Sequence, residues 1–327
     1  MQITSIYDKV CRREMIKAGE VGNEIRIYAD HPDVYEAWEW QEYSLDKYMT
    51  VTALESVEVV DDGARRGIRI VRPYKQSKIT QTIWFWDDIA KIDFDTVADW
   101  HQHHLMVKAV FPTNINSEKA TYEVQFGTVE RPTHKNTSWD KAKFEVCAQK
   151  FADLSEGGYG VSIINDCKYG HDIHDGEISI SLIKCATYPN EVADQGEIPF
   201  IYSICPHAGR FDESETTKLA YYLNYPMTAV KASGESSTLP ESYSAVTLDK
   251  ENVICETVKE SECGDGTIIR LYESKNMRGF VNLKTDIKFE KAYLCDLMEN
   301  ELSELEVKDG EVELEVGCFE IVTVKLK

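Results

Sequence analysis

The segment RPTHKNTSWDKAKFEVCAQKFADLSEGGYGVSIINDCKYGHD, residues 131–172, decides how the rest of this chain is interpreted. Apolar residues occupy every second position in 142–146 and in 159–164, which is the pattern of a β-strand with one buried face. Polar loops precede the first run and follow the second. We therefore expect two strands here, with loops at their ends that carry donors, acceptors and charges, and such loops are common binding sites.

Short alternating runs continue along the chain and predict an all-β protein. Turn sequences such as DDG at 61–63 separate them, and long helical periodicity is absent. Short strands with frequent turns are typical of sandwiches of antiparallel sheets. We expect Trp84 and Trp86 on one face of a strand and Phe85 on the other, within the core between the sheets. Besides the two strands above, the expected strands up to residue 204 are 3–7, 24–28, 56–60, 67–72, 78–86, 90–94, 105–111, 121–126, 177–183 and 200–204.

A linker-like stretch, ASGESSTLPE at 232–241, divides the chain. We expect a first domain over 1–231, a linker over 232–243 and a second domain over 244–327. The length of 327 residues is sufficient for two hydrophobic cores, because single cores stop growing near about 250–300 residues. The second domain is expected to be a small β-sandwich with strands at 245–248, 253–258, 267–272, 279–283, 291–294, 311–316 and 318–326.

Charge and cysteine content restrict the class of partner. The net charge is −21, from 57 acidic and 36 basic residues, and it repels phosphate backbones and anionic lipid headgroups. We therefore expect no nucleic acid and no membrane as partner, whereas a neutral sugar is compatible with this charge. Nine cysteines without a CxxC pair indicate reduced thiols, and no apolar run is long enough for a membrane span, so we expect a cytoplasmic protein.

Motifs of a self-contained active site are missing. No GxSxG, HExxH, GxGxxG or P-loop sequence is present. Glycoside hydrolysis takes two carboxyl groups at a set separation. Asp166 with Asp172, or Glu145 with Asp153, are candidate pairs among many other carboxylates.

The histidines at 101, 103 and 104 form a cluster that a metal site could use. His101 and His103 would share one face of a strand, but zinc needs a third protein ligand and the spacing supplies none. We expect these histidines to be structural and the chain to hold no metal.

Longer motifs extend along most of the chain and are specific to one family. They are RPTH-NTSWD-A-FEV and FADLSE-GYGV-NDCKYG within 131–170, ITSIYDK at 3–9, DHP at 30–32, AW at 37–38, CPHAG at 205–209 and CFEI at 318–321. Together they resemble the C-terminal region of glycoside hydrolase family 38, the class II α-mannosidases, of the bacterial and cytosolic or vacuolar type. The resemblance implies a large antiparallel, galactose-mutarotase-like β-supersandwich followed by a smaller β-sandwich.

The resemblance also implies a function. Family 38 enzymes are retaining α-mannosidases whose aspartate nucleophile, acid/base carboxylate and zinc ion lie in an N-terminal α/β catalytic domain. This sequence contains none of that domain, so we expect no catalytic residue here and an isolated chain that folds without activity. The implied partners are the catalytic domain and a mannose-containing oligosaccharide. An apolar patch normally covered by the catalytic domain would favour a homo-oligomer.

In the resembled family, loops of the β-domain close one side of the sugar pocket. The expected pocket residues are Asn165, Asp166, Lys168, Tyr169, His134 and Asn136. An amide, a carboxylate and an ammonium group together bind vicinal hydroxyl groups, and a tyrosine ring offers a surface for a sugar face. The same sequences are also ordinary turn formers. Many relatives have an arginine where this chain has Lys184-Cys185, so a bidentate contact does not carry over to this position.

An alternative function is a stand-alone carbohydrate-binding or aldose-epimerase-like β-sandwich. An epimerase needs a histidine acid and a carboxylate base on facing strands. His134 with Glu145 is the nearest pair that the sequence offers.

Overall fold

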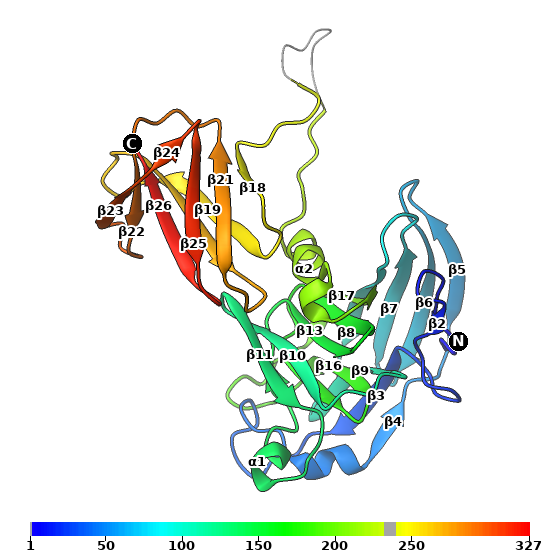
Figure 1. The fold of residues 1–327 in the computed structure, drawn as a ribbon. Helices are drawn as coiled ribbons and strands as arrows, with labels where there is room; N and C mark the ends of the chain where they lie inside the picture. The colour runs from blue at the N-terminus through cyan, green and yellow to red at the C-terminus, as the bar shows by residue number, and fades with distance from the viewer. Residues whose placement is uncertain (1, 232–239) are drawn as a thin grey trace. The chain divides into compact units, whose positions relative to one another are not determined.

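A computed structural model describes residues 2–231 and 240–327 of the chain (Figure 1). These residues divide into two compact units. Unit 1 comprises Met1–Glu123 and Val129–Met227, and unit 2 comprises Val124–Thr128 and Thr228–Lys327. The linker predicted at 232–243 lies mostly outside the described residues, so its limits and those of the two domains stay a prediction.

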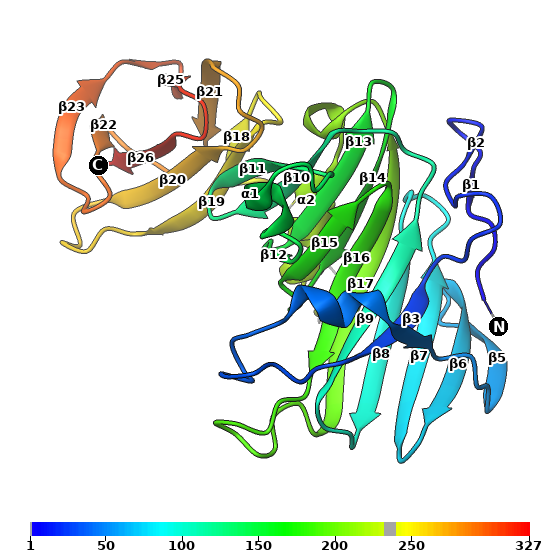
Figure 2. The same cartoon turned by 90° about the horizontal axis from the view of Figure 1, so that it is seen from below.

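Unit 1 contains a nine-stranded sheet in the order β11-β10-β13-β14-β17-β8-β7-β6-β5, and several of these strands are seen side by side in Figure 2. Neighbours from β10 through β13, β14, β17, β8, β7 and β6 to β5 pair antiparallel. The strands are β5 (Ser56–Asp61), β6 (Arg66–Tyr74), β7 (Ser77–Phe85), β8 (Ile92–Trp100), β10 (Lys119–Val124), β11 (Gly127–Pro132), β13 (Phe151–Glu156), β14 (Tyr159–Asn165) and β17 (Gly196–Ala208).

A six-stranded antiparallel sheet in the order β12-β15-β16-β9-β3-β4 forms the second layer of unit 1. Its strands are β3 (Glu24–Ala29), β4 (Tyr48–Thr50), β9 (Leu105–Pro112), β12 (Val146–Cys147), β15 (Gly170–His174) and β16 (Glu177–Lys184). The remaining elements of unit 1 are β1 (Tyr7–Asp8), β2 (Arg13–Glu14), η1 (Glu42–Asp46), α1 (Ser138–Lys141), η2 (Phe211–Glu213) and α2 (Thr216–Asn224).

The period-two alternation of β14 explains how the nine-stranded sheet is covered on both faces. Val161 and Ile163 are fully buried in the main core between the two large sheets. Ile164 points to the other face, where it packs with Phe211 and with Ala220 of α2 in a separate cluster. The strand is therefore buried on both sides, and its sequence, YGVSIIN, is correspondingly poor in charge.

A polar bridge crosses the main core of unit 1. The Tyr202 hydroxyl of β17 donates to Oδ1 of Asn23 at 2.6 Å and accepts from Nε2 of Gln81 at 2.9 Å. Asn23 precedes β3 in one sheet, whereas Gln81 lies on β7 in the other. Because each of these buried groups has a partner, the bridge links the sheets without the cost of an unpaired polar group.

Unit 2 is a smaller sandwich of a four-stranded sheet, β18-β21-β25-β24, and a five-stranded sheet, β19-β20-β26-β22-β23. Its core is mostly valine and leucine, and it includes Leu271, Val281, Leu314 and Val324. The strands are β18 (Val246–Leu248), β19 (Val253–Glu260), β20 (Thr267–Glu273), β21 (Gly279–Thr285), β22 (Ala292–Cys295), β23 (Glu301–Leu305), β24 (Val307–Lys308), β25 (Glu311–Val316) and β26 (Ile321–Leu326). The predicted fold, a large antiparallel supersandwich followed by a smaller sandwich, is confirmed.

Two helices correct the predictions made from alternation. The strand expected at 142–146 is wrong in most of its length, because α1 ends at Lys141 and only Val146 joins β12. The Thr137 side chain accepts from the backbone of Asp140, whose side chain accepts from Thr137, and this capping box starts the helix. The short helix α2, which covers the aromatic segment before Tyr225, was also not predicted.

The expectation for the tryptophan pair is confirmed only in part: Trp84 and Trp86 share one side, against the same Arg65 guanidinium, but they do not lie in the core between the sheets. Trp84 is buried, but on the face of β7 opposite Ile83, which belongs to the main core. The Arg65 guanidinium lies 4.4 Å from the Trp84 ring and 5.1 Å from the Trp86 ring. Arg65 therefore packs against both rings on the side where the second sheet was expected. The strand expected at 3–7 is reduced to a bridge at Ile3 and the short β1.

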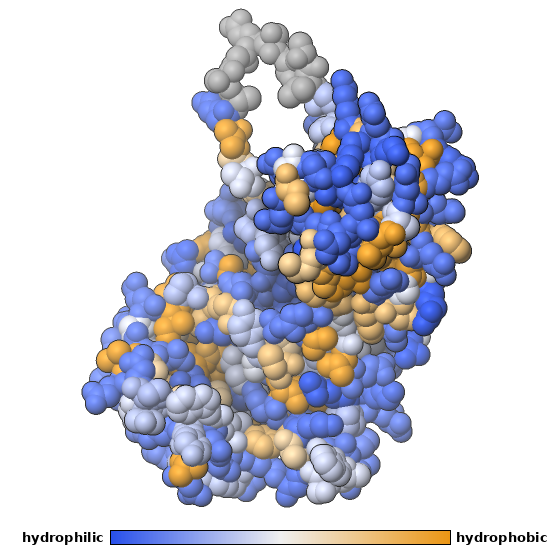
Figure 3. All heavy atoms as spheres, turned by 90° about the vertical axis from the view of Figure 1, so that its left-hand side faces the viewer, coloured by the Kyte–Doolittle hydropathy of each residue, from blue (hydrophilic) through white to orange (hydrophobic). Residues whose placement is uncertain are grey.

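Hydrophilic residues make up most of the face seen in Figure 3, with hydrophobic side chains scattered between them. This surface agrees with the excess of acidic residues. Within residues 2–231 and 240–327, no helix has the length and hydrophobicity needed to cross a bilayer.

Gly160 of β14 provides a test of the packing across three strands. A Cβ at this position would lie 2.2 Å from Oγ of Ser155 and 2.3 Å from Cε1 of His207. We expect Gly160→Ala to lower the free energy of unfolding by about 1–3 kcal/mol, because the His207 ring is held by a hydrogen bond to Asp153. Gly158→Ala is the matched control, since nothing lies within 4 Å of its Cβ. Urea unfolding followed by tryptophan fluorescence measures both, and equal stability of the two variants would contradict this packing.

Candidate functional site

The loop predicted to face a sugar, residues 165–169, joins β14 to β15. Asn165 is 1% exposed, donates from Nδ2 to the Gln149 carbonyl at 3.1 Å and accepts at Oδ1 from the Lys168 backbone at 2.7 Å. The amide therefore holds the loop in shape. Tyr169 is 51% exposed, and the Lys168 ammonium lies 4.6 Å from the centre of the Phe200 ring. Asp166 has a buried Oδ1 without a hydrogen-bond partner.

His134 and Asn136 lie at the other end of β15. The backbone of Asp175, directly after β15, donates to the Thr133 carbonyl at 3.2 Å, whereas Tyr169 directly precedes the same strand. Five residues of strand, about 15 Å, separate the two positions. The structure therefore does not bring His134 and Asn136 together with the 165–169 loop, and the binding role of all six residues stays a prediction.

A set of polar side chains that the sequence did not predict to meet lies at the same end of unit 1 as the 165–169 loop. Lys184, the last residue of β16, forms an ion pair with Asp30, which follows β3. Asp30 is 2% exposed, and its burial raises its pKa although Lys184 opposes this shift. Lys184 also lies 5.9 Å from the Trp40 ring. A buried carboxylate and an aromatic ring thus fix the position of a partly exposed ammonium group.

Glu36 arranges the loops around this lysine. Its carboxylate accepts from the backbone and hydroxyl of Thr187, both at 2.9 Å, and from the backbone of Tyr188 at 3.2 Å. These hydrogen bonds lower the pKa of Glu36. Beside it, the rings of His31 and His104 stack at 5.0 Å. We call Asp30, Glu36, Trp40 and Lys184 the Lys184 cluster. Asp30 belongs to the DHP motif noticed in the sequence, but only folding brings it to Lys184 of β16.

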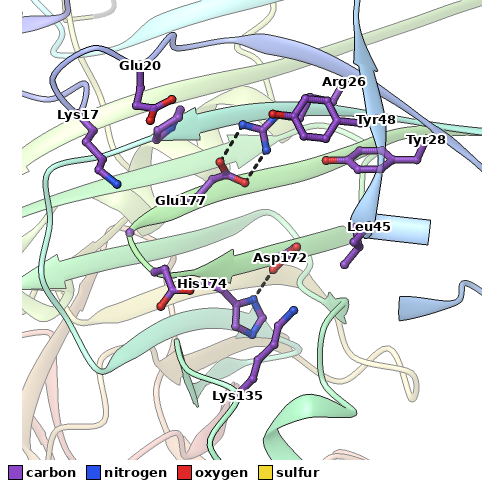
Figure 4. A pocket seen from close by; sticks show the side chains of 13 residues that line it. Lys17, Glu20, Arg26, Tyr28, Leu45, Tyr48, Lys135, Asp172, His174 and Glu177 are labelled. Atoms are coloured by element: carbon purple, nitrogen blue, oxygen red, sulfur yellow. Dashed lines mark hydrogen bonds and ion pairs between the residues drawn. The ribbon is translucent and has the colours of Figure 1, made fainter. Parts of the chain in front are cut away.

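A second site lies on the outward face of the six-stranded sheet, where a hollow of about 450 Å³ opens (Figure 4). We call it the polar hollow. Side chains of β15, β16, β3 and β4, with β9 between β16 and β3, point into it, since residues of equal parity on paired strands share a face. They are Arg26, Tyr28, Tyr48, Asp172, His174 and Glu177.

Arg26 is fixed on three sides. Its guanidinium makes two hydrogen bonds with Glu177, at 2.8 and 2.9 Å, and one with Glu24 at 2.6 Å. The Tyr48 ring lies 4.4 Å from the same guanidinium. Burial opposes the charged form, yet the two glutamates outweigh it and raise the pKa of Arg26. The group is therefore permanently charged and locally neutralised.

Asp172 is the acidic centre of the hollow. It pairs with His174, and its Oδ2 lies 3.8 Å from Nζ of Lys108, which is only 1% exposed. Burial opposes the charge on Lys108, but the carboxylates of Glu145 and Asp172 outweigh this and raise its pKa. Burial likewise opposes the charge on Asp172, and Lys108 with His174 outweighs it and lowers its pKa. Asp172 is thus a carboxylate at neutral pH.

Glu145 and Asp153, one of the two carboxyl pairs considered from the sequence, do not form an acid/base pair. Glu145 is used by Lys108 and Ser181, while Asp153 lies on the outward face of the nine-stranded sheet and binds His207 at 2.8 Å and Ser162 at 2.6 Å. Because Glu145 is already bonded to a buried lysine, nothing favours it as the base of an epimerase with His134.

Comparison with known proteins identifies the family. The family model described as "Glycosyl hydrolases family 38 C-terminal domain" matches residues 2–192, and "Glycosyl hydrolases family 38 C-terminal beta sandwich domain" matches residues 252–324. The chain belongs to glycoside hydrolase family 38. This confirms the resemblance stated from the motifs.

Curated relatives of this family 38 chain are α-mannosidases. "Alpha-mannosidase 2C1" of Homo sapiens is 33% identical over 99% of this chain, which covers 32% of the relative. "Alpha-mannosidase G" of Dictyostelium discoideum is 35% identical over 84% of the chain and is covered over 26% of its length. A crystal structure of an alpha-mannosidase from Enterococcus faecalis shares the fold, with a TM-score of 0.80 and 16% identity over 99% of this chain and 40% of that one. The chain thus spans about a third of the length of these curated relatives.

Family 38 implies zinc, and the residues of this chain do not fit that ion. Within 2–231 and 240–327, no three or more histidine, cysteine, aspartate or glutamate side chains gather as a metal site would require. Of the clustered histidines, His101 lies 2.7 Å from Asp99, while His104 stacks on His31. We therefore derive no chemistry of this chain from zinc.

The buried ion pair below the polar hollow gives a first prediction for this site. Lys108→Met removes the cation between Glu145 and Asp172, and we expect it to lower the stability of unit 1 by about 3–5 kcal/mol. The control Lys119→Met removes an exposed ion pair with Glu130 and should cost no more than about 1 kcal/mol. The addition of Glu145→Gln to Lys108→Met should restore part of the loss. Urea unfolding followed by fluorescence is suitable, because all six tryptophans precede residue 140. An Lys108→Met variant as stable as the control would refute this role.

His171, the inward neighbour of Asp172, gives a second prediction, on pH. It is completely buried, and burial lowers its pKa from 6.5 to about 4. The unfolded chain binds a proton there below pH 6.5 while the folded chain does not, so the free energy of unfolding should fall as the pH decreases from 6.5 to 4, by about 3 kcal/mol. His171→Asn should lose this part of the pH dependence, and the exposed-site control His103→Asn should keep it. Unfolding curves at several pH values that show the same slope for all three proteins would overturn the assignment.

Proposed function

We propose that this chain is the C-terminal portion of a retaining α-mannosidase that hydrolyses terminal α-mannosides of mannose-containing oligosaccharides. The observation that carries the proposal is the match of 99% of the chain to one third of a human α-mannosidase. The catalytic carboxyl groups and the zinc ion belong, in this proposal, to a catalytic domain outside this sequence. The isolated chain is then catalytically incomplete, and its partners are that domain and the oligosaccharide.

The end of unit 1 that carries the Lys184 cluster and the 165–169 loop is proposed to form one wall of the sugar pocket. Lys184 offers N–H donors to sugar hydroxyl groups, and its position is set by Asp30. Tyr169 and Trp38, 51% and 68% exposed, offer ring faces to a sugar. Asn165, Asp166 and Lys168 keep the role predicted for them from the sequence. His134 and Asn136 have no support as members of the same wall, because they lie across β15.

The proposed location is the cytoplasm. All nine cysteines are free thiols in the described structure. Burial raises the pKa of the Cys167 thiol to about 11, and it also raises the pKa of the Cys185 thiol. Unpaired thiols are in keeping with a reducing compartment. A homo-oligomer stays a prediction.

Reconstitution tests the proposal. The chain and a family 38 catalytic domain are produced separately and mixed, and hydrolysis of 4-nitrophenyl α-D-mannopyranoside is measured together with bound zinc. We expect no hydrolysis and no zinc with the chain alone, and both in the mixture. Turnover or stoichiometric zinc with the chain alone would sink the proposal.

Substitution of Lys184 in the reconstituted enzyme tests the proposed pocket wall directly. Lys184→Met keeps the length of the side chain but removes its donors, and we expect kcat/KM to fall about 10- to 100-fold, the loss typical of a charged hydrogen bond. The control Lys218→Met, on the exposed surface of α2, should leave kcat/KM unchanged. Full activity of Lys184→Met in a correctly folded protein would remove this residue from the pocket.

A further inference from the structure

The polar hollow is not used by the function proposed above. It lies on the outward face of the six-stranded sheet. Asp172 and His174, in the middle and at the C-terminal end of β15, line it, whereas the 165–169 loop precedes the N-terminal end of this strand. Lys135 of the loop after β11 lines it at the far side (Figure 4). A volume of about 450 Å³ falls within the range of about 300–1,000 Å³ that is usual for small-molecule sites.

The charges of Arg26 and Asp172 are already paired within the protein, which argues against an ionic ligand at these two groups. The lining of the hollow has the acidic residues Glu20, Asp172, Asp175 and Glu177 and the basic residues Lys17, Arg26 and Lys135. Arg26 is already neutralised by Glu24 and Glu177, and Lys108 beneath it by Glu145 and Asp172. An anion would compete with these carboxylates for each paired cation, and a cation would compete with the buried lysine for Asp172.

Paired charges still have unused hydrogen-bonding capacity. A guanidinium has five N–H groups, of which Arg26 uses three with its glutamates, and each carboxylate oxygen accepts more than one hydrogen bond. Asp172 has one side-chain partner at His174 and the more distant Lys108. Donors and acceptors held side by side in this way match a ligand whose own groups both donate and accept, which is the property of a hydroxyl group.

The same groups are fixed before any ligand arrives. Arg26 is held by two carboxylates and the Tyr48 ring, and Asp172 is held by Lys108, which is 1% exposed. Little rotamer freedom remains to be lost on binding, which favours affinity at a small site.

One side of the hollow is apolar. The rings of Tyr28 and Tyr48 lie 5.6 Å apart, Tyr48 is 43% exposed, and Leu45 of η1 adds aliphatic surface. A pyranose ring has hydroxyl groups at its rim and C–H groups on its faces, so it meets an aromatic surface and a polar wall at the same time.

We propose that the polar hollow binds one neutral pyranose unit of a carbohydrate. Asp172, Glu177 and Arg26 bind its hydroxyl groups, and Tyr48 packs against its C–H face. This binding does not depend on the catalytic role proposed for the whole protein, and it is a property of the 327-residue chain alone.

The test is a titration of the ¹⁵N-labelled chain with methyl α-D-mannopyranoside, followed by two-dimensional NMR. We expect saturable shifts that include backbone amides of β4 and β15, with a dissociation constant on the order of 1 mM, as is usual for small contact areas. Tyr48→Ala and Asp172→Asn should each weaken binding about tenfold or more. Tyr222→Ala, an exposed tyrosine on α2, is the matched control and should bind as the unchanged chain does.

Three outcomes would overturn the inference. The first is the absence of saturable shifts with the mannoside and with methyl α-D-glucopyranoside. The second is stronger binding of inorganic phosphate than of either sugar at the same residues. The third is binding that Lys184→Met abolishes and Tyr48→Ala leaves intact, which would place the sugar at the Lys184 cluster. None of these depends on turnover, so a failure here is distinguishable from a failure of the reconstitution assay.

Discussion

The burial of one face of each large sheet against the other is the constraint on which the rest of unit 1 depends. Such a core accepts polar groups mainly in matched sets, as with Tyr202, Asn23 and Gln81, or as neutral groups, as with His171. Arg72 is a buried exception on the inward face of β6, and the other charged side chains named above lie on the outward faces and at the strand ends. Both candidate sites are found in those places.

The two sites have the same construction. In each, a buried charged residue holds a more exposed one of opposite sign: Asp30 holds Lys184, and Lys108 holds Asp172. An ion pair of this kind contributes little net stability, because the loss of hydration offsets the attraction. Its effect is to fix the direction of the exposed partner, which is what a site for hydroxyl groups requires.

Much of the fold could be predicted from the sequence, because alternation is a local property. The strand at 159–164 and most others appear where alternation placed them. The failures have local causes as well. Most of the alternating residues 142–146 do not form a strand, because they follow the short helix α1 that the Thr137 capping box starts. The helix α2 was missed because nine residues are too few to show a clear helical period. Trp84 was expected in the main core because the inward face of β7 was assigned from its aromatic residues. In the structure Ile83 lies on the inward face and Trp84 on the opposite one.

The candidate sites could be predicted only in part. Loop residues such as Tyr169 are visible in a sequence as polar segments between strands, whereas Arg26 and Glu177 meet through the pairing of β3 with β9 and of β9 with β16. Residues more than 140 positions apart thus become neighbours by registers that no local pattern contains. For the same reason the sequence could not show that β15 separates His134 from Tyr169, and the two were expected in one pocket.

The five residues of β15 alternate between two environments, with His171 and Ile173 inward and Asp172 and His174 outward. The gain or loss of a single codon within this strand would exchange the two sets, moving an aspartate into the apolar interior and an isoleucine to the surface. Evolutionary change in length is thereby confined to the connecting segments on either side of β15. Insertions and deletions should therefore be tolerated in the segments beside β15 but not within its five residues.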